Sequence, residues 1–175
     1  MFRQRLSRKE MVEIESGYAG RPGLARLEPG DTAAVAGLFS RLSAESLYRR
    51  FFSPVLRVEQ FTRLVLRVDG HDRAAVAAVV DGEVVGVAQY SRRPGAGSAE
   101  LAIMVADSWQ RQGLGTRMVA ALAERAATEG IERFDVDVQG DNYGALRLLQ
   151  RVAPGMRLAF SGGVGEGGFP VGGHE

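Results

Sequence analysis

The sequence predicts a single α/β or α+β domain in which helices cover both faces of a mixed sheet. Three observations lead to this prediction. Apolar residues recur with helical spacing before residue 66, and the pattern changes to apolar strand segments from residue 73. The dipeptide Asp81-Gly82 joins two apolar segments. A chain of 175 residues, 45% of them hydrophobic, has the size of one domain and can fill a core.

The N-terminal third is expected to be mainly helical. Residues 1–20 are polar and precede a turn rich in glycine and proline, so we expect an extension or short flanking helix there, followed by the domain at 21–175. A strand is predicted at 24–27. Three helices follow: one capped by Asp31 and running to about residue 42, one opened by Ser43 and stopped by Pro54, and one at 59–65.

The remainder of the chain is expected to supply most of the sheet. An Asp-Gly pair suits the type I′ turn of a hairpin, so AAVAAVV and EVVGVAQY are predicted to be adjacent antiparallel strands. After a loop at 92–98 we expect a strand, a helix, a strand and a helix at 99–105, 114–129, 131–138 and 142–151. The glycine-rich tail beyond Pro154 suggests terminal strands.

Composition excludes several classes of function. The net charge of +1 gives no broad field for nucleic acid or an anionic membrane, and neither partner is expected. There is no cysteine, so disulfides, thiolate metal sites and a cysteinyl intermediate are excluded. The two histidines fit no metal-ligand motif, and no metal is expected. Without a signal-like or membrane-spanning apolar run, we expect a cytoplasmic protein.

The most informative segment is AELAIMVADSWQRQGLGTRMVAALAERA, which predicts a strand, a glycine loop and a helix. Amides in the first turn of a helix lack internal partners, and glycines allow a ligand to approach the backbone, so this loop is suited to a pyrophosphate. A Walker A loop is excluded because the only lysine is Lys9. A dinucleotide fingerprint does not fit either, since Met118 replaces its third glycine.

The same loop resembles the Q/R-x-x-G-x-G/A signature of the GNAT family of N-acetyltransferases, through Gln110, Gly113 and Gly115. The blocks LEPGDTAAVAGLFSRLSAESLYRRFF and GIERFDVDVQGDNYGALRLL are also similar to this family, closest to the acetyltransferase domain of bacterial protein lysine acetyltransferases. The resemblance implies acetyl-CoA as acyl donor and a mixed, mostly antiparallel sheet with a splayed pair of parallel strands. It assigns to cofactor binding Ile103, Met104, Val105, Gln110, Arg111, Gln112, Gly113, Leu114, Gly115, Thr116 and Asn142.

Glu100 is the candidate general base. An amine with a pKa of about 10.4 is protonated at neutral pH and must lose a proton before it attacks a thioester. Family members similar to this chain carry a glutamate at the corresponding strand position, and we expect burial near the cleft. The alternative is a solvated carboxylate on an exposed strand face. For Asn142, an N-terminal helix cap explains the residue as well as a cofactor contact does.

The general acid is not identified, because the family's usual tyrosine position is Leu149 here. Tyr143 lies one residue after Asn142 and is expected to point elsewhere. Water is the alternative proton donor to the leaving thiolate.

Three functions remain open. The first is acetylation of a primary amine, with a protein lysine suggested by the resemblance. The second is acetylation of a small-molecule amine, and the third is a non-catalytic acyl-CoA sensor. A solvent-exposed, unpaired Glu100 favours the sensor, whereas a cleft position favours catalysis. Without a cysteine, direct transfer in a ternary complex is predicted. A homodimer is left open.

Overall fold

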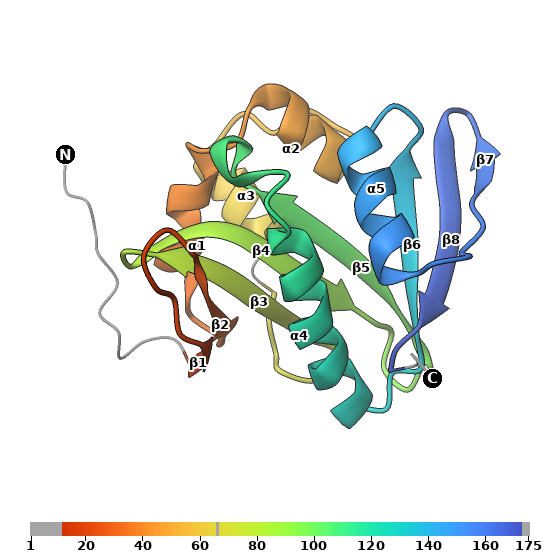
Figure 1. Ribbon diagram of the computed structural model, residues 1–175, viewed down its shortest axis with the longest axis horizontal. Coiled ribbons are helices and arrows are strands. Elements are labelled where there is room, and N and C mark those ends of the chain that lie inside the picture. Colours follow the sequence, from red (N-terminus) through yellow and green to blue (C-terminus); the bar gives the residue numbers. More distant parts are fainter. Residues whose placement is uncertain (1–11, 66, 173–175) are drawn as a thin grey trace.

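The computed structural model describes residues 12–65 and 67–172. They form one eight-stranded sheet in the order β1-β2-β3-β4-β5-β6-β8-β7 (Figure 1). The strands span Val12–Glu15 (β1), Gly23–Leu27 (β2), Arg73–Val80 (β3), Glu83–Ser91 (β4), Ser98–Val105 (β5), Arg133–Gln139 (β6), Ala159–Ser161 (β7) and Val164–Pro170 (β8). Every neighbouring pair is antiparallel except β5 and β6. The predicted mixed sheet is thus confirmed.

Helices lie on both faces of the sheet, as predicted. α4 and α5 cover one face, and α1, α2 and α3 lie on the other (Figure 1). The helices span Thr32–Phe39 (α1), Ala44–Phe51 (α2), Val58–Val65 (α3), Leu114–Thr128 (α4) and Tyr143–Val152 (α5). Ser43 begins α2 as expected, because its Oγ accepts a hydrogen bond from the amide of Ser46 at 3.1 Å.

The hairpin of β3 and β4 has the turn that its sequence requires. Asp81 and Gly82 both have positive φ angles, 50° and 78°, which is the backbone of a type I′ turn. The two strands pair from Arg73 opposite Ser91 to Val80 opposite Glu83. Their apolar side chains are buried, so this hairpin forms the centre of the sheet.

Two N-terminal predictions differ from the structure. β1 pairs with β2, so residues 12–15 belong to the sheet rather than to an extension, while residues 1–11 lie outside the described part. Asp31 does not cap α1 with its side chain. Its Oδ2 instead accepts a hydrogen bond from the amide of Glu28 at 2.6 Å and closes the preceding turn, and α1 ends at Phe39.

The packing of α4 fixes the position of the glycine loop. One side of this helix is buried against the sheet, through Leu114, Met118, Val119, Leu122 and Ala126. A Cβ atom on Gly86 of β4 would lie only 3.1 Å from the Met118 Cε, so the glycine permits this close approach. Because β5 ends at Val105 and α4 begins at Leu114, the loop between them lies at the carboxyl end of β5.

Candidate active site

A wedge separates β5 from β6. The two strands pair only at Ser98 with Arg133, Ala99 with Phe134 and Glu100 with Asp135. Beyond Glu100, β5 continues to Val105 along β4, while β6 continues to Gln139 along β8. The facing edges of β5 and β6 are therefore unpaired over this stretch, and this is the splayed parallel pair that the resemblance predicts.

Peptide groups of β5 are directed into the wedge. The Ala106 amide donates to the Val85 oxygen at 2.8 Å. Peptide groups alternate between the two edges of an antiparallel strand, so Met104 faces β4 while Ile103 and Val105 face the open edge. The Val105 oxygen accepts a hydrogen bond from Gln110 Nε2 at 3.0 Å. Ile103 and the Val105 amide remain to pair with an extended chain in the wedge.

A row of amides lies at the mouth of the wedge. A short 3₁₀ turn, Asp107–Trp109, leads into the loop, where Arg111 and Gly113 adopt left-handed backbone conformations with φ angles of 62° and 77°. Within residues 12–65 and 67–172, the amides of residues 111–116 donate no hydrogen bond. Such a row at the start of a 15-residue helix favours an anion, as the sequence predicted.

The two glycines of the loop serve different purposes. Gly113 has a left-handed conformation that a side chain disfavours, and the space around its Cβ position is open. At Gly115 a Cβ atom would lie 3.1 Å from Leu148 Cδ2. Gly113 thus shapes the loop, whereas Gly115 allows α4 to pack closely against α5.

A polar network that the sequence analysis did not find supports the loop from α2. Asp107 Oδ1 accepts hydrogen bonds from the Ser43 amide at 3.1 Å and from Ser46 Oγ at 2.9 Å, and Gln110 Nε2 donates to Ser46 Oγ at 3.3 Å. Partial burial raises the pKa of Asp107, but the hydrogen bonds from Ser43 and Ser46 outweigh it, so the pKa lies below its ordinary value. Gln110 therefore holds the loop in place through hydrogen bonds to Ser46 and Val105.

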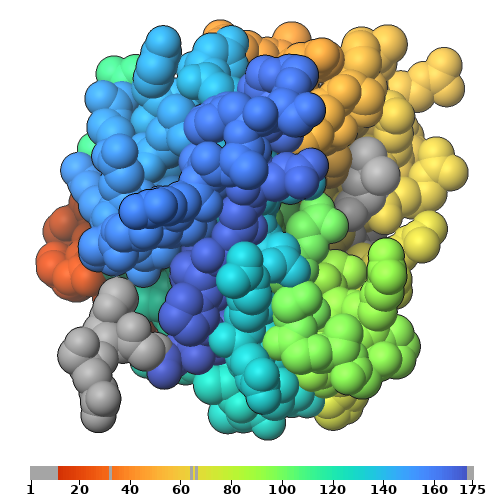
Figure 2. Space-filling model, turned by 90° about the vertical axis from the view of Figure 1, so that its right-hand side faces the viewer, coloured from red at the N-terminus to blue at the C-terminus, as the bar shows by residue number. Residues whose placement is uncertain are grey.

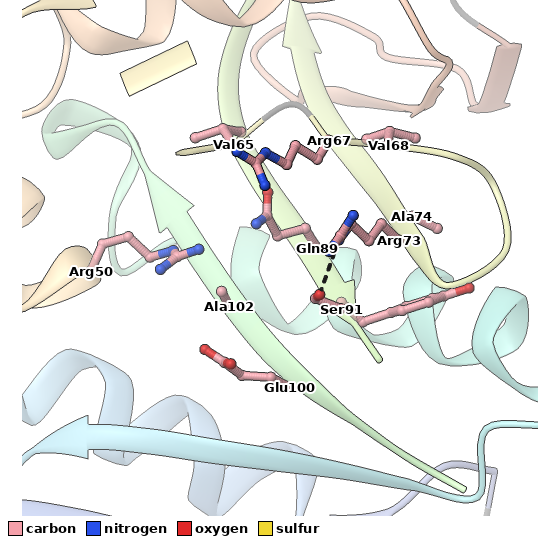
Figure 3. A pocket seen from close by; sticks show the side chains of 11 residues that line it. Arg50, Val65, Arg67, Val68, Arg73, Ala74, Gln89, Ser91, Glu100 and Ala102 are labelled. Carbon is pink, nitrogen blue, oxygen red and sulfur yellow. Dashed lines mark hydrogen bonds between the residues drawn. The ribbon is translucent and has the colours of Figure 1, made fainter. Parts of the chain in front are cut away.

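Glu100 lies at the last paired position before the wedge, on the sheet face that carries α2. It lines a cavity of about 160 Å³ with side chains of α2, α3, β3 and β4 (Figure 3). The side chain itself is exposed, which differs from the expected burial. In the described residues it takes part in no ion pair.

Asp135, opposite Glu100 on β6, is already engaged. It pairs with Arg133 at 2.8 Å. Desolvation raises the pKa of Asp135, but hydrogen bonds from Arg133 and Ser98 prevail and hold it below its ordinary value. Of the two carboxylates at this position, Glu100 is the one without such a partner in the part of the chain that the structure describes.

Other candidate residues have structural partners. Asn142 caps α5, because its Oδ1 accepts a hydrogen bond from the Ala145 amide at 3.2 Å. Leu149 is buried in the core, whereas Tyr143 is 67% exposed. His71 contacts Glu129 at 3.0 Å, away from the wedge. A cofactor contact for Asn142 stays a prediction.

The described residues contain no group of three or more metal-ligating side chains. None of their helices has the length and hydropathy that a membrane crossing requires.

Comparisons with known proteins agree with this geometry. The chain is 29% identical over 146 residues to the acetyltransferase Pat of Mycolicibacterium smegmatis, an alignment that covers 81% of this chain and 43% of the relative. The chain thus spans less than half the length of this curated relative.

Solved structures share the fold. The GNAT domain of S. lividans PAT superposes with a TM-score of 0.79 at 22% identity, over 94% of this chain and 99% of that domain. Spermidine N-acetyltransferase from Vibrio cholerae, solved with CoA and spermine, superposes with a TM-score of 0.65 at 15% identity, over 87% of this chain and 97% of its own.

A family model establishes the relationship. The model described as the acetyltransferase (GNAT) family matches residues 41–153, which is more than half of the chain. This segment contains the wedge, the glycine loop and Glu100. The protein therefore belongs to the acetyltransferase (GNAT) family.

Proposed function

We propose that the protein transfers an acetyl group from acetyl-CoA to a primary amine. The observation that carries the proposal is the position of Glu100. It lies at the last paired position of β5 and β6, where the open edge of β5 begins and beside a cavity on the other side of the strand. Donor and acceptor can therefore approach the same point from two sides.

The residues present fit the donor. The peptide groups of Ile103 and Val105 are suited to pair with the pantetheine arm, in the manner of an added strand. The amides of residues 111–116 are suited to hold the pyrophosphate. When bound, acetyl-CoA supplies an acetyl group activated as a thioester.

Glu100 is assigned the role of general base. It accepts a proton from the acceptor ammonium, so that the neutral amine forms the new C–N bond as the C–S bond breaks. The nitrogen loses its second proton as the amide forms, and water relays this proton to the leaving thiolate, because the buried Leu149 supplies none.

A protein lysine is the acceptor that the similarity to Pat favours. The exposure of Glu100 is the observation that favours the alternative, a sensor that binds acyl-CoA without turnover.

The deciding experiment measures acetyl-CoA-dependent thiol release with lysine peptides, intact proteins and small amines. Removal of a general base by Glu100→Gln should lower kcat by about 10²- to 10⁴-fold and leave CoA affinity unchanged. Asp137→Asn is the matched control, because it removes an exposed carboxylate from the neighbouring strand. Saturable CoA binding without release for any acceptor would establish the sensor instead.

Direct transfer also has a kinetic signature. Initial-rate lines should intersect when both substrates are varied, because no cysteine is present to carry the acetyl group. Parallel lines would contradict direct transfer in a ternary complex.

A further inference from the structure

The cavity beside Glu100 is strongly cationic. Its charged side chains are Arg50 from α2, Arg67 after α3, Arg73 from β3 and Glu100 from β5, so three positive charges face one negative charge and the net charge is +2 (Figure 3). Gln89 and Ser91 of β4 add neutral polar groups. In Figure 2 the orange atoms around α2 lie beside the yellow atoms of α3 and the segment after it.

Arg50 is the most constrained of these arginines. Its guanidinium carbon lies 4.6 Å from the centre of the Phe51 ring, and its Nε is buried with no hydrogen-bond partner. When the Gln89 amide is oriented to satisfy both its ends, its oxygen accepts from Arg50 Nη2 at 3.2 Å. Burial lowers the pKa of Arg50, and the negative charge of Glu100 acts in the opposite direction.

Elsewhere in the fold, partly buried arginines have carboxylate partners. Four such contacts measure 2.6 Å for Arg41 with Glu83, 2.6 Å for Arg92 with Asp72, 2.8 Å for Arg117 with Glu15 and 3.0 Å for Arg125 with Glu129. Among residues 12–65 and 67–172, the three cavity arginines take part in no ion pair. Arg67 and Arg73 are exposed, so the cost of withdrawing a charge from water falls on Arg50. Its guanidinium and the net positive charge of the cavity favour an anion that the chain does not supply.

We propose that the cavity binds a carboxylate of the acceptor, next to the amine that Glu100 deprotonates. This proposal rests on the proposed function, because it uses the same Glu100 as the amine-binding group. The planar guanidinium group can donate two parallel hydrogen bonds to a carboxylate. Arg50 lines the cavity from α2, and Arg73 lines it from β3. A site with Glu100 beside three arginines thus recognises an acceptor that carries both an ammonium group and a carboxylate.

Such a carboxylate has two sources. It is either the α-carboxylate of a free amino acid, or an acidic side chain next to a lysine in a polypeptide. A volume of about 160 Å³ holds several water-sized groups, which is enough for either source. In both cases the negative charge must lie close to the amine.

The test compares ligands that differ only in this charge. Binding of L-lysine and L-lysinamide is measured by calorimetry, with and without CoA. A second arm uses blocked lysine peptides flanked by glutamate or by glutamine. Loss of a charge-assisted hydrogen bond should weaken binding by at least about tenfold in one arm, and that arm identifies the source.

Variants locate the effect in the cavity. Arg73→Gln and Arg50→Gln should abolish the preference for the charged ligand. Arg151→Gln, which removes an exposed arginine from α5, should retain it. Arg73 is exposed, so its replacement tests the site even if Arg50→Gln impairs folding.

The outcomes separate this proposal from the previous one. Equal binding of charged and uncharged ligands in both arms would overturn the carboxylate site, whatever the rate of thiol release. A preference without thiol release for any acceptor would support the carboxylate site and contradict acetyl transfer. A preference that persists in Arg73→Gln and Arg50→Gln would also overturn the site, because it would originate elsewhere.

Discussion

The proposed donor and acceptor sides of Glu100 are built in different ways. On the donor side, the main features are peptide groups: the open edge of β5 and the amides of residues 111–116. Side chains on that side, such as Asp107 and Gln110, hold the backbone in place. On the acceptor side the features are side chains, three arginines and one glutamate, with charges that the chain does not balance.

The two sides depend on the sequence in different ways. Backbone geometry depends on strand order and loop conformation, and the superposed structures share the overall fold at little sequence identity. Cavity charge depends on single residues and changes with one substitution. The donor is therefore inferred from the fold, and the acceptor from the individual side chains.

The largest effect on the donor side is expected from Gly113→Ala. A side chain in the left-handed conformation costs about 1 kcal/mol and disturbs the amides around it, so CoA affinity should fall by at least about tenfold. Titration of CoA against the fluorescence of Trp109, next to the loop, measures the change.

Gly95→Ala provides the matched control. Gly95 has the same φ angle of 77° and the same open surroundings, but it lies in the loop between β4 and β5. Both variants should lose similar stability, and only Gly113→Ala should lose CoA affinity. An equal loss of affinity in both would refute the assignment of the loop.

Substitution should lower the free energy of unfolding more at an arginine that has a carboxylate partner than at one that has none. Arg92→Gln removes contacts of 2.6 Å to the Asp72 carboxylate and 2.6 Å to the Glu129 oxygen, so unfolding free energy should fall by about 1.5–3 kcal/mol. Arg73→Gln should change it by less than about 0.5 kcal/mol. Urea denaturation compares the two, and a similar loss in both would mean that Arg73 is structural.

The smallest expected effect is a loss of folding stability at low pH. The folded-state pKa of Asp107 lies below its ordinary value of 3.8, so the unfolded chain binds the proton more readily. Its contribution to stability is present above about pH 3.8 and is lost as the pH falls through the folded-state pKa. Asp107 is exposed, so the contribution should be less than about 1 kcal/mol.

Melting temperatures between pH 7 and pH 3 test this expectation. In Asp107→Asn the decline in acid should be shallower than in the wild type. An unchanged pH profile would show that the hydrogen bonds from Ser43 and Ser46 do not stabilise the charged form.

Local sequence signals predicted the elements that depend on neighbouring residues. The Asp81-Gly82 turn, the cap at Ser43 and the order of strand, glycine loop and helix around Gly113 are each determined within a few positions. β1 was missed although Val12–Glu15 alternates apolar and polar residues, because an alternation of only four residues does not stand out within a polar segment.

Contacts between distant segments could not be predicted from local signals. Asp107 meets Ser43 across 64 positions, and the cavity brings together Arg50, Arg73 and Glu100 from three separate elements. The positions of these residues in the sequence follow no helical or strand periodicity that would place them together. The expected burial of Glu100 was wrong for the same reason, because exposure depends on how α2 and β6 are placed around it.

The short pairing of β5 with β6 has a mechanical consequence. Within the sheet, three residue pairs of β5 and β6 join the C-terminal strands to the other strands. The packing of α5 on α4 and of Phe134 against Tyr90 adds to this connection. A ligand chain lying in the wedge would span this seam and add backbone hydrogen bonds that the polypeptide leaves unmade. Its binding energy is then also folding energy, so the donor concentration in the cell would help determine how firmly the two halves of the molecule hold together.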